Sequence, residues 1–510
     1  MAALEARSPA PRRIGPVPWL VVLAVALVPA IGLLALHRWA DGRAPDPDAL
    51  AEIPAPLVDP PLPPDPLANV ALSFRRVPEV LSRDLNVERF RGEVAAFLDE
   101  VGDRSCASVA VDGTVVGARN ADLAVIPAST QKLVVAAVAL DVLGADHVFR
   151  TSVLASAAPV DGTVAGDLVL LGGGDPVLTS SWYPTSGIER RPVQDGTSLD
   201  ELADRVRDAG VTRIEGSVLG DGSRHDDERY APGWGTGVAG LEAGPYGGLM
   251  ANDSRVLGED VKADDPAAGA AREFARLLGE RGIEVVGGAS AGSATSLGAS
   301  PVELAAIDSA PLDDVVAEML TTSDNNTAEV LVKEIGAAEA AAGGADGAPV
   351  GATRQAGLDV MLERLGRWGV DTAPVVLADG SGLSPDDRLT CDALLTVLER
   401  DDVDGPIGSG LAVAGETGTL ADVFASSDVA GRLRGKTGTL NNPPFNQDPP
   451  AVKALAGYLP VDGGGAVEYA LVLNGPTISD QSEYRPVWNA FADTIDTYPS
   501  GASPADVGLR

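Results

Sequence analysis

Metal-binding and basic residues are scarce in this sequence, and their scarcity argues against several functions. The 510 residues include two cysteines, three histidines and 4% aromatic residues. Neither cysteine lies in a CxxC or Cys/His pattern, so we expect no zinc site and no other cofactor. The formal net charge is −35 at pH 7. Such a charge disfavours nucleic acid as a partner, because the phosphate backbone is bound through Lys and Arg.

Lysine is scarce as well, and one lysine has an unusual place. Lys132 lies within "VIPASTQKLVVAAVAL" (residues 125–140), an apolar stretch that predicts a helix ending near Gly144. Ser129 precedes it by three residues, so on a helix the amine can reach the serine hydroxyl. A lysine kept neutral by burial can act as the base for a serine nucleophile. Taken alone, the pattern is better explained by a serine near the helix N-cap and a lysine that snorkels to solvent. The chain has five lysines: Lys132, Lys262, Lys333, Lys436 and Lys453.

The N-terminal region contains a long uncharged stretch at residues 17–36. As a helix, about 20 apolar residues span the hydrocarbon core of a bilayer. Arg7, Arg12 and Arg13 precede the stretch, so the positive-inside rule predicts that residues 1–16 are cytoplasmic and that the remainder lies outside. We expect an uncleaved signal-anchor that holds the protein at the cell membrane. The alternatives are a cleaved signal peptide with secretion, although no clean Ala-x-Ala site follows, and a buried core helix.

A stretch rich in proline and acidic residues separates this segment from the globular part. Residues 44–66 contain nine prolines, so we interpret residues 37–80 as an extended linker. Outside the cytoplasm, cysteines meet an oxidising environment. Cys106 and Cys391 would then either form a disulfide or remain as two buried thiols.

From about residue 81 the chain has the patterning of a folded protein, and its length predicts two or three domains. "VERFRGEVAAFLDEV" (87–101) predicts an amphipathic helix, and residues 106–120 predict two strands joined by a turn at Asp112-Gly113. Residues from 150 to about 300 contain short strands cut by glycine and two helices, which indicates an inserted α/β region. Further helices are predicted at 312–320, 326–336 and 485–496, and strands at 432–440, 452–459 and 467–474.

Three short motifs occur once each, in a meaningful order. They are Ser-x-x-Lys at 129–132, Ser-Asp-Asn at 323–325 and Lys-Thr-Gly at 436–438. Separately, the second fits an N-cap serine and the third a strand and turn. In this order, they are the signature of penicillin-interacting serine acyltransferases.

With these motifs, the sequence resembles the penicillin-binding D-alanyl-D-alanine carboxypeptidases/endopeptidases of peptidase family S13, the low-molecular-mass class C proteins. The resemblance covers roughly residues 85–498 and includes the stretches 166–178, 377–384, 413–420 and 433–440. It implies an α/β fold with a penicillin-binding transpeptidase/β-lactamase-like domain, an antiparallel sheet flanked by helices. The expected parts are a catalytic domain at 81–152 and 305–498, an inserted domain region at 153–304 and a polar tail at 499–510.

The resemblance also implies hydrolysis of peptidoglycan stem peptides through an acyl-enzyme, with β-lactam antibiotics as covalent inhibitors. Ser129 would attack the carbonyl between two D-alanines, with Lys132 as its general base. Ser323 would relay a proton to the leaving amine, and Asn325 would hold Lys132 and the substrate amide in place. Asp324 is expected to be structural.

Substrate binding is expected along the Lys-Thr-Gly segment. Lys436 would attract the terminal carboxylate of the substrate, helped by the hydroxyls of Thr437 and Thr439. Gly438 would let the substrate backbone lie close to the strand. The backbone N–H groups of Ser129 and Thr439 would form the oxyanion hole.

Some features leave alternatives open. Asp175 would either reach the peptide stem or form an Asp-Pro turn, and Pro385 stands where the family resemblance leads us to expect a basic residue. A β-lactamase shares the three motifs, but the chain lacks the Glu-x-x-Leu-Asn pattern of class A deacylation. A non-catalytic penicillin-binding cell-wall scaffold would not need all the motif residues intact. The sequence does not separate carboxypeptidase from endopeptidase activity.

Overall fold

The computed structural model describes residue 38 and residues 77–189, 192–342, 352–442, 449–461 and 465–499. From residue 78 onward, the described residues form one compact unit. In the described part of the chain, no helix combines the length and the apolar character that crossing a bilayer requires. The predicted membrane span at 17–36 lies outside the described residues and stays a prediction.

The larger sheet joins the beginning of the folded chain to its end. Its six strands are antiparallel to their neighbours, and β1 pairs with β16 from Cys106 opposite Val472 to Val111 opposite Val467. The predicted hairpin at 106–120 and the three predicted late strands are confirmed. The strand order is β13 (Ala412–Val413), β14 (Arg434–Leu440), β15 (Ala451–Pro460), β16 (Ala466–Gly475), β1 (Cys106–Val111) and β2 (Thr114–Arg119).

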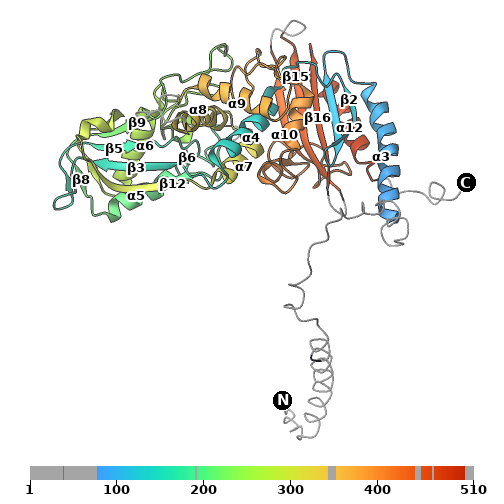
Figure 1. The fold of residues 1–510 in the computed structure, drawn as a ribbon. Helices are drawn as coiled ribbons and strands as arrows, with labels where there is room; N and C mark the ends of the chain where they lie inside the picture. The colour runs from blue at the N-terminus through green and yellow to red at the C-terminus, as the bar shows by residue number, and fades with distance from the viewer. Residues whose placement is uncertain are drawn as a thin grey trace, which may run out of the picture. The chain divides into compact units, whose positions relative to one another are not determined.

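Helices cover both faces of this sheet (Figure 1). Alternate side chains of β15 point to two cores, Ala454 to one and Leu455 to the other, as the two-residue period of a strand requires. The core that contains Leu455 is closed by α3 (Val77–Leu98) and α12 (Gln481–Ile495). The helix α3 begins before the predicted residue 87, because Pro78 is tolerated in the first turn, where backbone N–H groups need no helical partner.

The other core holds the helices that carry the candidate site. The first two turns of α4, residues 132–139, are buried, as their apolar sequence predicts. Figure 1 shows this group of helices between the larger sheet and the smaller ones. The helices are α4 (Lys132–Leu143), α7 (Leu312–Thr322), α8 (Asn325–Ala342), α9 (Arg354–Arg367), α10 (Cys391–Leu398) and α11 (Pro406–Gly410).

Residues 150–308 build the smaller sheets around a core of their own. The largest has five strands in the order β11 (Ala289–Ala291), β9 (Val218–Asp221), β5 (Leu168–Leu171), β3 (Arg150–Ala155) and β12 (Val302–Asp308). Its parallel and antiparallel pairs are packed against α5 (Leu199–Asp208) and α6 (Pro266–Glu280). The division into separate catalytic and inserted domains stays a prediction. The remaining strands are β4 (Thr163–Val164), β6 (Leu178–Thr179), β7 (Thr197–Ser198), β8 (Arg213–Ile214) and β10 (Glu284–Val285).

The two cysteines are joined by a disulfide. Cys106 lies on β1 and Cys391 begins α10, and their Cα atoms are 5.9 Å apart. The bond therefore ties the sheet to a helix that comes much later in the chain. Of the two alternatives for these cysteines, the structure has the disulfide rather than two free thiols.

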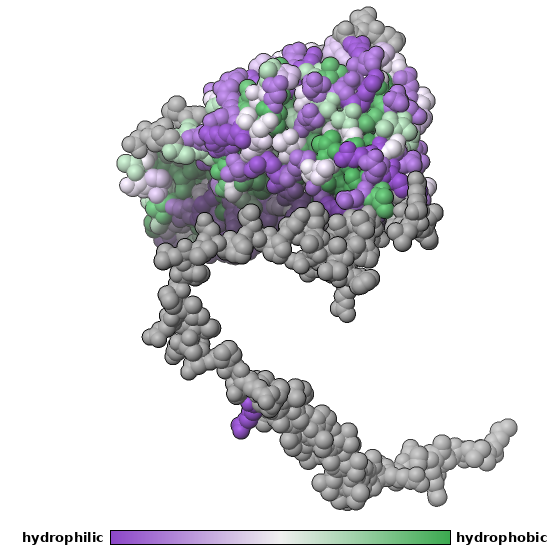
Figure 2. Space-filling model, turned by 45° about the vertical axis from the view of Figure 1, so that its right-hand side comes forward, coloured by the Kyte–Doolittle hydropathy of each residue, from purple (hydrophilic) through white to green (hydrophobic). Residues whose placement is uncertain are grey.

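The surface is mixed in character. On the face drawn in Figure 2, hydrophilic and hydrophobic residues alternate in small patches over the folded part. Scattered apolar residues are normal on a surface that faces water.

Candidate active site

Ser129 lies in a short turn that its neighbours hold in place. The turn is a 3-10 helix, Ala128–Gln131, that leads directly into α4, so the helix predicted to end near Gly144 is confirmed and its first turn, with Ser129, is 3-10 rather than α. Ala128 has φ 49°, in the left-handed region that is uncommon for residues other than glycine. A Cβ at Gly382 would overlap the carbonyl group of Ala128, so only glycine fits against this turn. Ser129 is the second residue of the turn and is half-buried.

The amine of Lys132 is within hydrogen-bonding distance of three oxygen atoms. Its Nζ lies 2.9 Å from Ser129 Oγ, 2.7 Å from Asn325 Oδ1 and 2.7 Å from the carbonyl oxygen of Ser381. The side chain is fully buried. The structure therefore places both predicted partners, Ser129 and Asn325, at the lysine, and adds a third.

Burial gives this lysine the properties of a base. Desolvation lowers the pKa of Lys132 to about 8, against the opposing effect of nearby carboxylates. A neutral amine has two N–H groups and one lone pair. The oxygen atoms of Ser381 and Asn325 can only accept hydrogen bonds, so both N–H groups are directed to them. The lone pair then faces the hydroxyl of Ser129, as removal of its proton requires.

Ser323 and Lys436 form a second pair. Ser323 ends α7 in the left-handed region, with φ 65°, and Asn325 begins α8. Lys436, fully buried on β14, donates from Nζ to Ser323 Oγ at 2.8 Å and to the carbonyl of Thr437 at 2.9 Å. The turn at 323–325 thus brings the two lysine-centred pairs together, since Ser323 joins one and Asn325 the other.

Asp324, between these two residues, has the geometry of a helix cap. Its Oδ1 accepts the N–H of Thr327 at 2.8 Å, which satisfies a free donor in the first turn of α8. Burial raises the pKa of Asp324 to about 7. This geometry agrees with the structural role that we expected.

The segment 436–440 of β14 lies beside the serine turn. A Cβ at Gly438 would stand 2.9 Å from the carbonyl oxygen of Pro127 and 3.1 Å from Ala128 Cβ. Glycine at 438 therefore allows the strand to approach the turn, a reason that the sequence did not suggest. Within the described residues, β13 pairs only with Gly435 and Arg434, so the edge of 436–440 opposite β15 has no strand partner.

Three other predicted residues have contacts that bear on their roles. The hydroxyl of Thr439 accepts a hydrogen bond from Lys453 Nζ at 2.8 Å, so a third lysine, which the sequence did not assign to the site, lies at this residue. Asp175 is buried and accepts the N–H of Val177 at 2.9 Å, as a turn-forming aspartate does. The carbonyl of Pro385 accepts a hydrogen bond from Arg388. A basic side chain therefore does lie at this position, but it belongs to a residue three places later.

Two backbone carbonyls at the site were missed by sequence reasoning. The carbonyl of Ser381 contacts Lys132, and the carbonyl of Glu242 accepts a hydrogen bond from Asn325 Nδ2 at 2.8 Å. Every residue has a backbone carbonyl, so no residue type in the sequence could have indicated these contacts. The stretch 377–384 stood out only by its resemblance, and nothing singled out Glu242.

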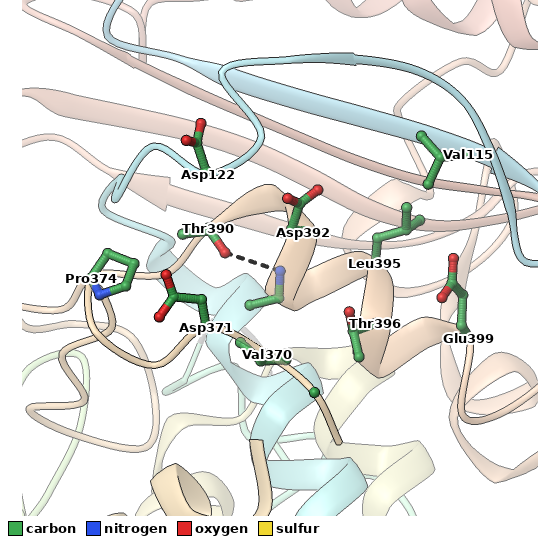
Figure 3. A pocket seen from close by; sticks show the side chains of 12 residues that line it. Val115, Asp122, Val370, Asp371, Pro374, Thr390, Asp392, Leu395, Thr396 and Glu399 are labelled. Atoms are coloured by element: carbon green, nitrogen blue, oxygen red, sulfur yellow. Dashed lines mark hydrogen bonds between the residues drawn. The ribbon is translucent and has the colours of Figure 1, made fainter. Parts of the chain in front are cut away.

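A pocket of about 420 Å³ lies elsewhere, along α10 (Figure 3). The hydroxyl of Thr390 accepts the N–H of Ala393 at 3.0 Å and caps this helix. Burial and Asp122 raise the pKa of Asp392, and burial and Asp392 raise that of Glu399. No lysine or arginine lines the pocket, so it disfavours an anionic ligand. Its lining comprises Val115, Asp122, Gly369, Val370, Asp371, Pro374, Thr390, Asp392, Ala393, Leu395, Thr396 and Glu399.

Known proteins are similar to this chain in sequence and in fold. A D-alanyl-D-alanine carboxypeptidase from an Actinomadura species is 29% identical over 475 residues, covering 76% of this chain and 81% of the relative. A carboxypeptidase from Mycobacterium tuberculosis is 30% identical over 385 residues, covering 72% of this chain and 74% of the relative. The crystal structure of penicillin binding protein 4 from Haemophilus influenzae superposes with a TM-score of 0.61 at 19% identity, covering 80% of this chain and 99% of that chain.

These similarities confirm the predicted fold class, an α/β fold with a penicillin-binding, β-lactamase-like domain. The family profile described as the D-Ala-D-Ala carboxypeptidase 3 (S13) family matches residues 94–237 and 246–495. This match includes all three motifs and most of the described chain. The chain belongs to the D-Ala-D-Ala carboxypeptidase 3 (S13) family.

Proposed function

We propose that this protein is a serine-type D-Ala-D-Ala carboxypeptidase that cleaves peptidoglycan stem peptides through an acyl-enzyme on Ser129. One observation carries the assignment of residues: the buried amine of Lys132 lies 2.9 Å from Ser129 Oγ, with both other near neighbours only able to accept hydrogen bonds. This arrangement directs a lone pair at a serine hydroxyl. It is the geometry that a general base for nucleophilic attack requires.

Acylation begins when Ser129 Oγ attacks the carbonyl carbon between the two D-alanines, while its proton passes to Lys132 Nζ. The carbonyl becomes a tetrahedral oxyanion, which the N–H groups of Ser129 and Thr439 would stabilise. The C–N bond then breaks. The proton that Lys132 took from Ser129 passes to the hydroxyl of Ser323, which gives its own proton to the leaving amine and accepts a hydrogen bond from Lys436. Lys132 is then neutral again.

Deacylation releases the shortened peptide. A water molecule attacks the ester carbon, gives up one proton and regenerates Ser129. Lys132 is in place to accept that proton and to return it to Ser129 Oγ as the ester bond breaks, because the hydrogen bonds to Asn325 and Ser381 hold its amine at the serine.

Substrate binding is proposed along the open edge of β14. Lys436 supplies a buried positive charge for the terminal carboxylate of the peptide. An extended peptide can pair with residues 436–440, whose edge opposite β15 has no strand partner among the described residues. The acidic pocket along α10 would repel such a carboxylate, so it is not the peptide site.

The same chemistry covers endopeptidase action on cross-linked stems, where the leaving amine belongs to a neighbouring peptide. We propose both activities on peptidoglycan. Digestion of defined pentapeptide and cross-linked muropeptides would separate their rates.

We further propose that residues 17–36 anchor the protein at the cell membrane, with the catalytic part outside the cytoplasm. Fractionation of cells that express the full chain tests the anchor, and recovery in the culture medium would instead indicate cleavage of a signal peptide.

β-Lactams test the acyl-enzyme directly. Attack on the strained lactam breaks its C–N bond, but the leaving nitrogen stays tethered, so the adduct persists. Intact mass after incubation with benzylpenicillin should show one adduct on the wild type and none on Ser129→Ala. An unmodified wild type would overturn the proposal in favour of a non-catalytic scaffold, and rapid turnover of the drug would favour a β-lactamase.

A further inference from the structure

A buried carboxylate lies directly behind the loop that holds Lys132. Glu329, on the second turn of α8, is fully buried. Its Oε1 accepts the N–H of Gly380 at 3.1 Å and that of Ser381 at 2.7 Å. The carbonyl of Ser381 in turn accepts a hydrogen bond from Lys132 Nζ at 2.7 Å. One residue therefore separates the carboxylate from the amine.

We propose that Glu329 is a positioning residue for Lys132, which holds the Ser381 carbonyl on the amine and whose negative charge favours the protonated form. The inference rests on the acyl-enzyme function proposed above, in which Lys132 is the general base. Glu329 itself touches neither the substrate nor the reacting atoms.

The first part of this role follows from the direction of hydrogen bonds at the amine. With two carbonyl-type acceptors in place, a neutral Lys132 uses both N–H groups on them and turns its lone pair to Ser129. If Ser381 moved away, one N–H would be released and could turn to Ser129 Oγ. The amine would then donate to the serine rather than accept its proton.

The second part follows from the charges around the lysine. Four carboxylates face Lys132: Asp379 and Asp387 from the loop, and Glu329 and Asp324 from α8 and its cap. Each favours the protonated amine, whereas burial lowers the pKa of Lys132 to about 8. The balance between burial and these charges decides how much neutral base is present near neutral pH.

Glu329 differs from the other three in what it holds. Asp324 caps α8 through Thr327, and Asp379 accepts the N–H groups of Gly382 and Ser384. The remaining aspartate, Asp387, accepts from Gln131 and from the N–H of Ala378. Only Glu329, among these four carboxylates, accepts the N–H of Ser381 itself.

The surroundings of Glu329 also bring its pKa close to neutral pH. Burial and Asp379 raise the pKa of Glu329 to about 7. Arg354 opposes this effect, because its pKa is raised in part by Glu329. The charge of Glu329 also helps burial to raise the pKa of Tyr246. Removal of the Glu329 charge should lower the pKa of Lys132, because this charge favours the protonated amine.

The experiment compares the pH dependence of acylation by benzylpenicillin in wild type and Glu329→Gln. Glutamine leaves an oxygen for the two N–H groups but removes the charge. Loss of a nearby opposite charge should move the acid limb of the rate profile to lower pH by about one unit. Glu329→Met, which has no acceptor oxygen, should lower the plateau rate about tenfold below that of Glu329→Gln.

Glu318→Gln is the matched control. This buried glutamate on α7 accepts the N–H of Gln194 at 2.8 Å and has no hydrogen bond to the loop at 379–384. Its acid limb should coincide with that of the wild type. An unmoved limb in Glu329→Gln would overturn the inference, even if Glu329→Met failed to fold. A wild type that forms no adduct would instead refute the proposed function.

Discussion

Replacing Gly382 by alanine should disable the nucleophile without touching any motif residue. A Cβ at this position would overlap the carbonyl of Ala128 and lie 3.1 Å from the backbone nitrogen of Ser129. Gly382 also has φ 77°, in the left-handed region that favours glycine. Relief of the overlap must move either the serine turn or the loop that carries the Ser381 carbonyl.

The expected loss of stability in Gly382→Ala has two parts, and a control variant can separate them. A left-handed alanine costs roughly 1–2 kcal/mol. Insertion of a methyl group into a packed site costs about 1–3 kcal/mol more. Gly369→Ala carries the first cost without the second, because Gly369 has φ 91° and open space around its Cβ position. A displacement of about 1 Å at the reacting atoms lowers rates roughly 100-fold.

The assay is the second-order rate constant for acylation by a fluorescent penicillin, measured beside thermal unfolding. Gly382→Ala should acylate about 100-fold more slowly than wild type and melt at a lower temperature than Gly369→Ala. Gly369→Ala should acylate at close to the wild-type rate. Equal acylation rates in the two variants would refute the steric reasoning.

Three further outcomes are expected. The acylation rate should rise with pH through about 8, since only the neutral amine of Lys132 can take the proton of Ser129, and a pH-independent rate would contradict this role. Lys436→Met should lower kcat/KM roughly 10- to 100-fold for peptides that end in a free carboxylate, and much less for matching amides. An equal loss for both would argue against carboxylate recognition. Trp234→Phe keeps an aromatic side chain but removes the five-membered ring, whose N–H donates to Asp379 Oδ2 at 2.8 Å, so the free energy of unfolding should fall by about 1–3 kcal/mol. Thermal unfolding like that of the wild type would show that this bond is dispensable.

Local patterns in the sequence predicted most of the elements around the site. The apolar run after Lys132 is a buried helix, and the strand pairs at 106–120 and 452–474 lie where alternation and turn residues indicated. The order of strands could not be predicted, because the pairing of β1 with β16 joins segments from opposite ends of the folded chain. No local pattern encodes such a contact.

The sequence singled out the motif residues that the structure brings together, but it did not single out the backbone carbonyls and the buried carboxylate around them. Ser129 and Lys132 were visible because two side chains with reactive groups stand three residues apart. The carbonyls of Ser381 and Glu242 act through the backbone, which is the same in every residue. Glu329 was hidden for another reason, since an acidic residue within a helix is usually exposed and here is buried.

The disulfide between Cys106 and Cys391 closes a long covalent loop in the chain. The two cysteines are 285 positions apart, and Ser129 and Ser323 lie within the closed loop. A protease that cuts once anywhere between them leaves two fragments that remain covalently joined. The fragment with Lys436 would therefore stay attached to the remaining part of the site, and a nicked protein would migrate as one species until it is reduced. In a compartment that contains proteases, the closed loop would keep the parts of the site together after a single cleavage.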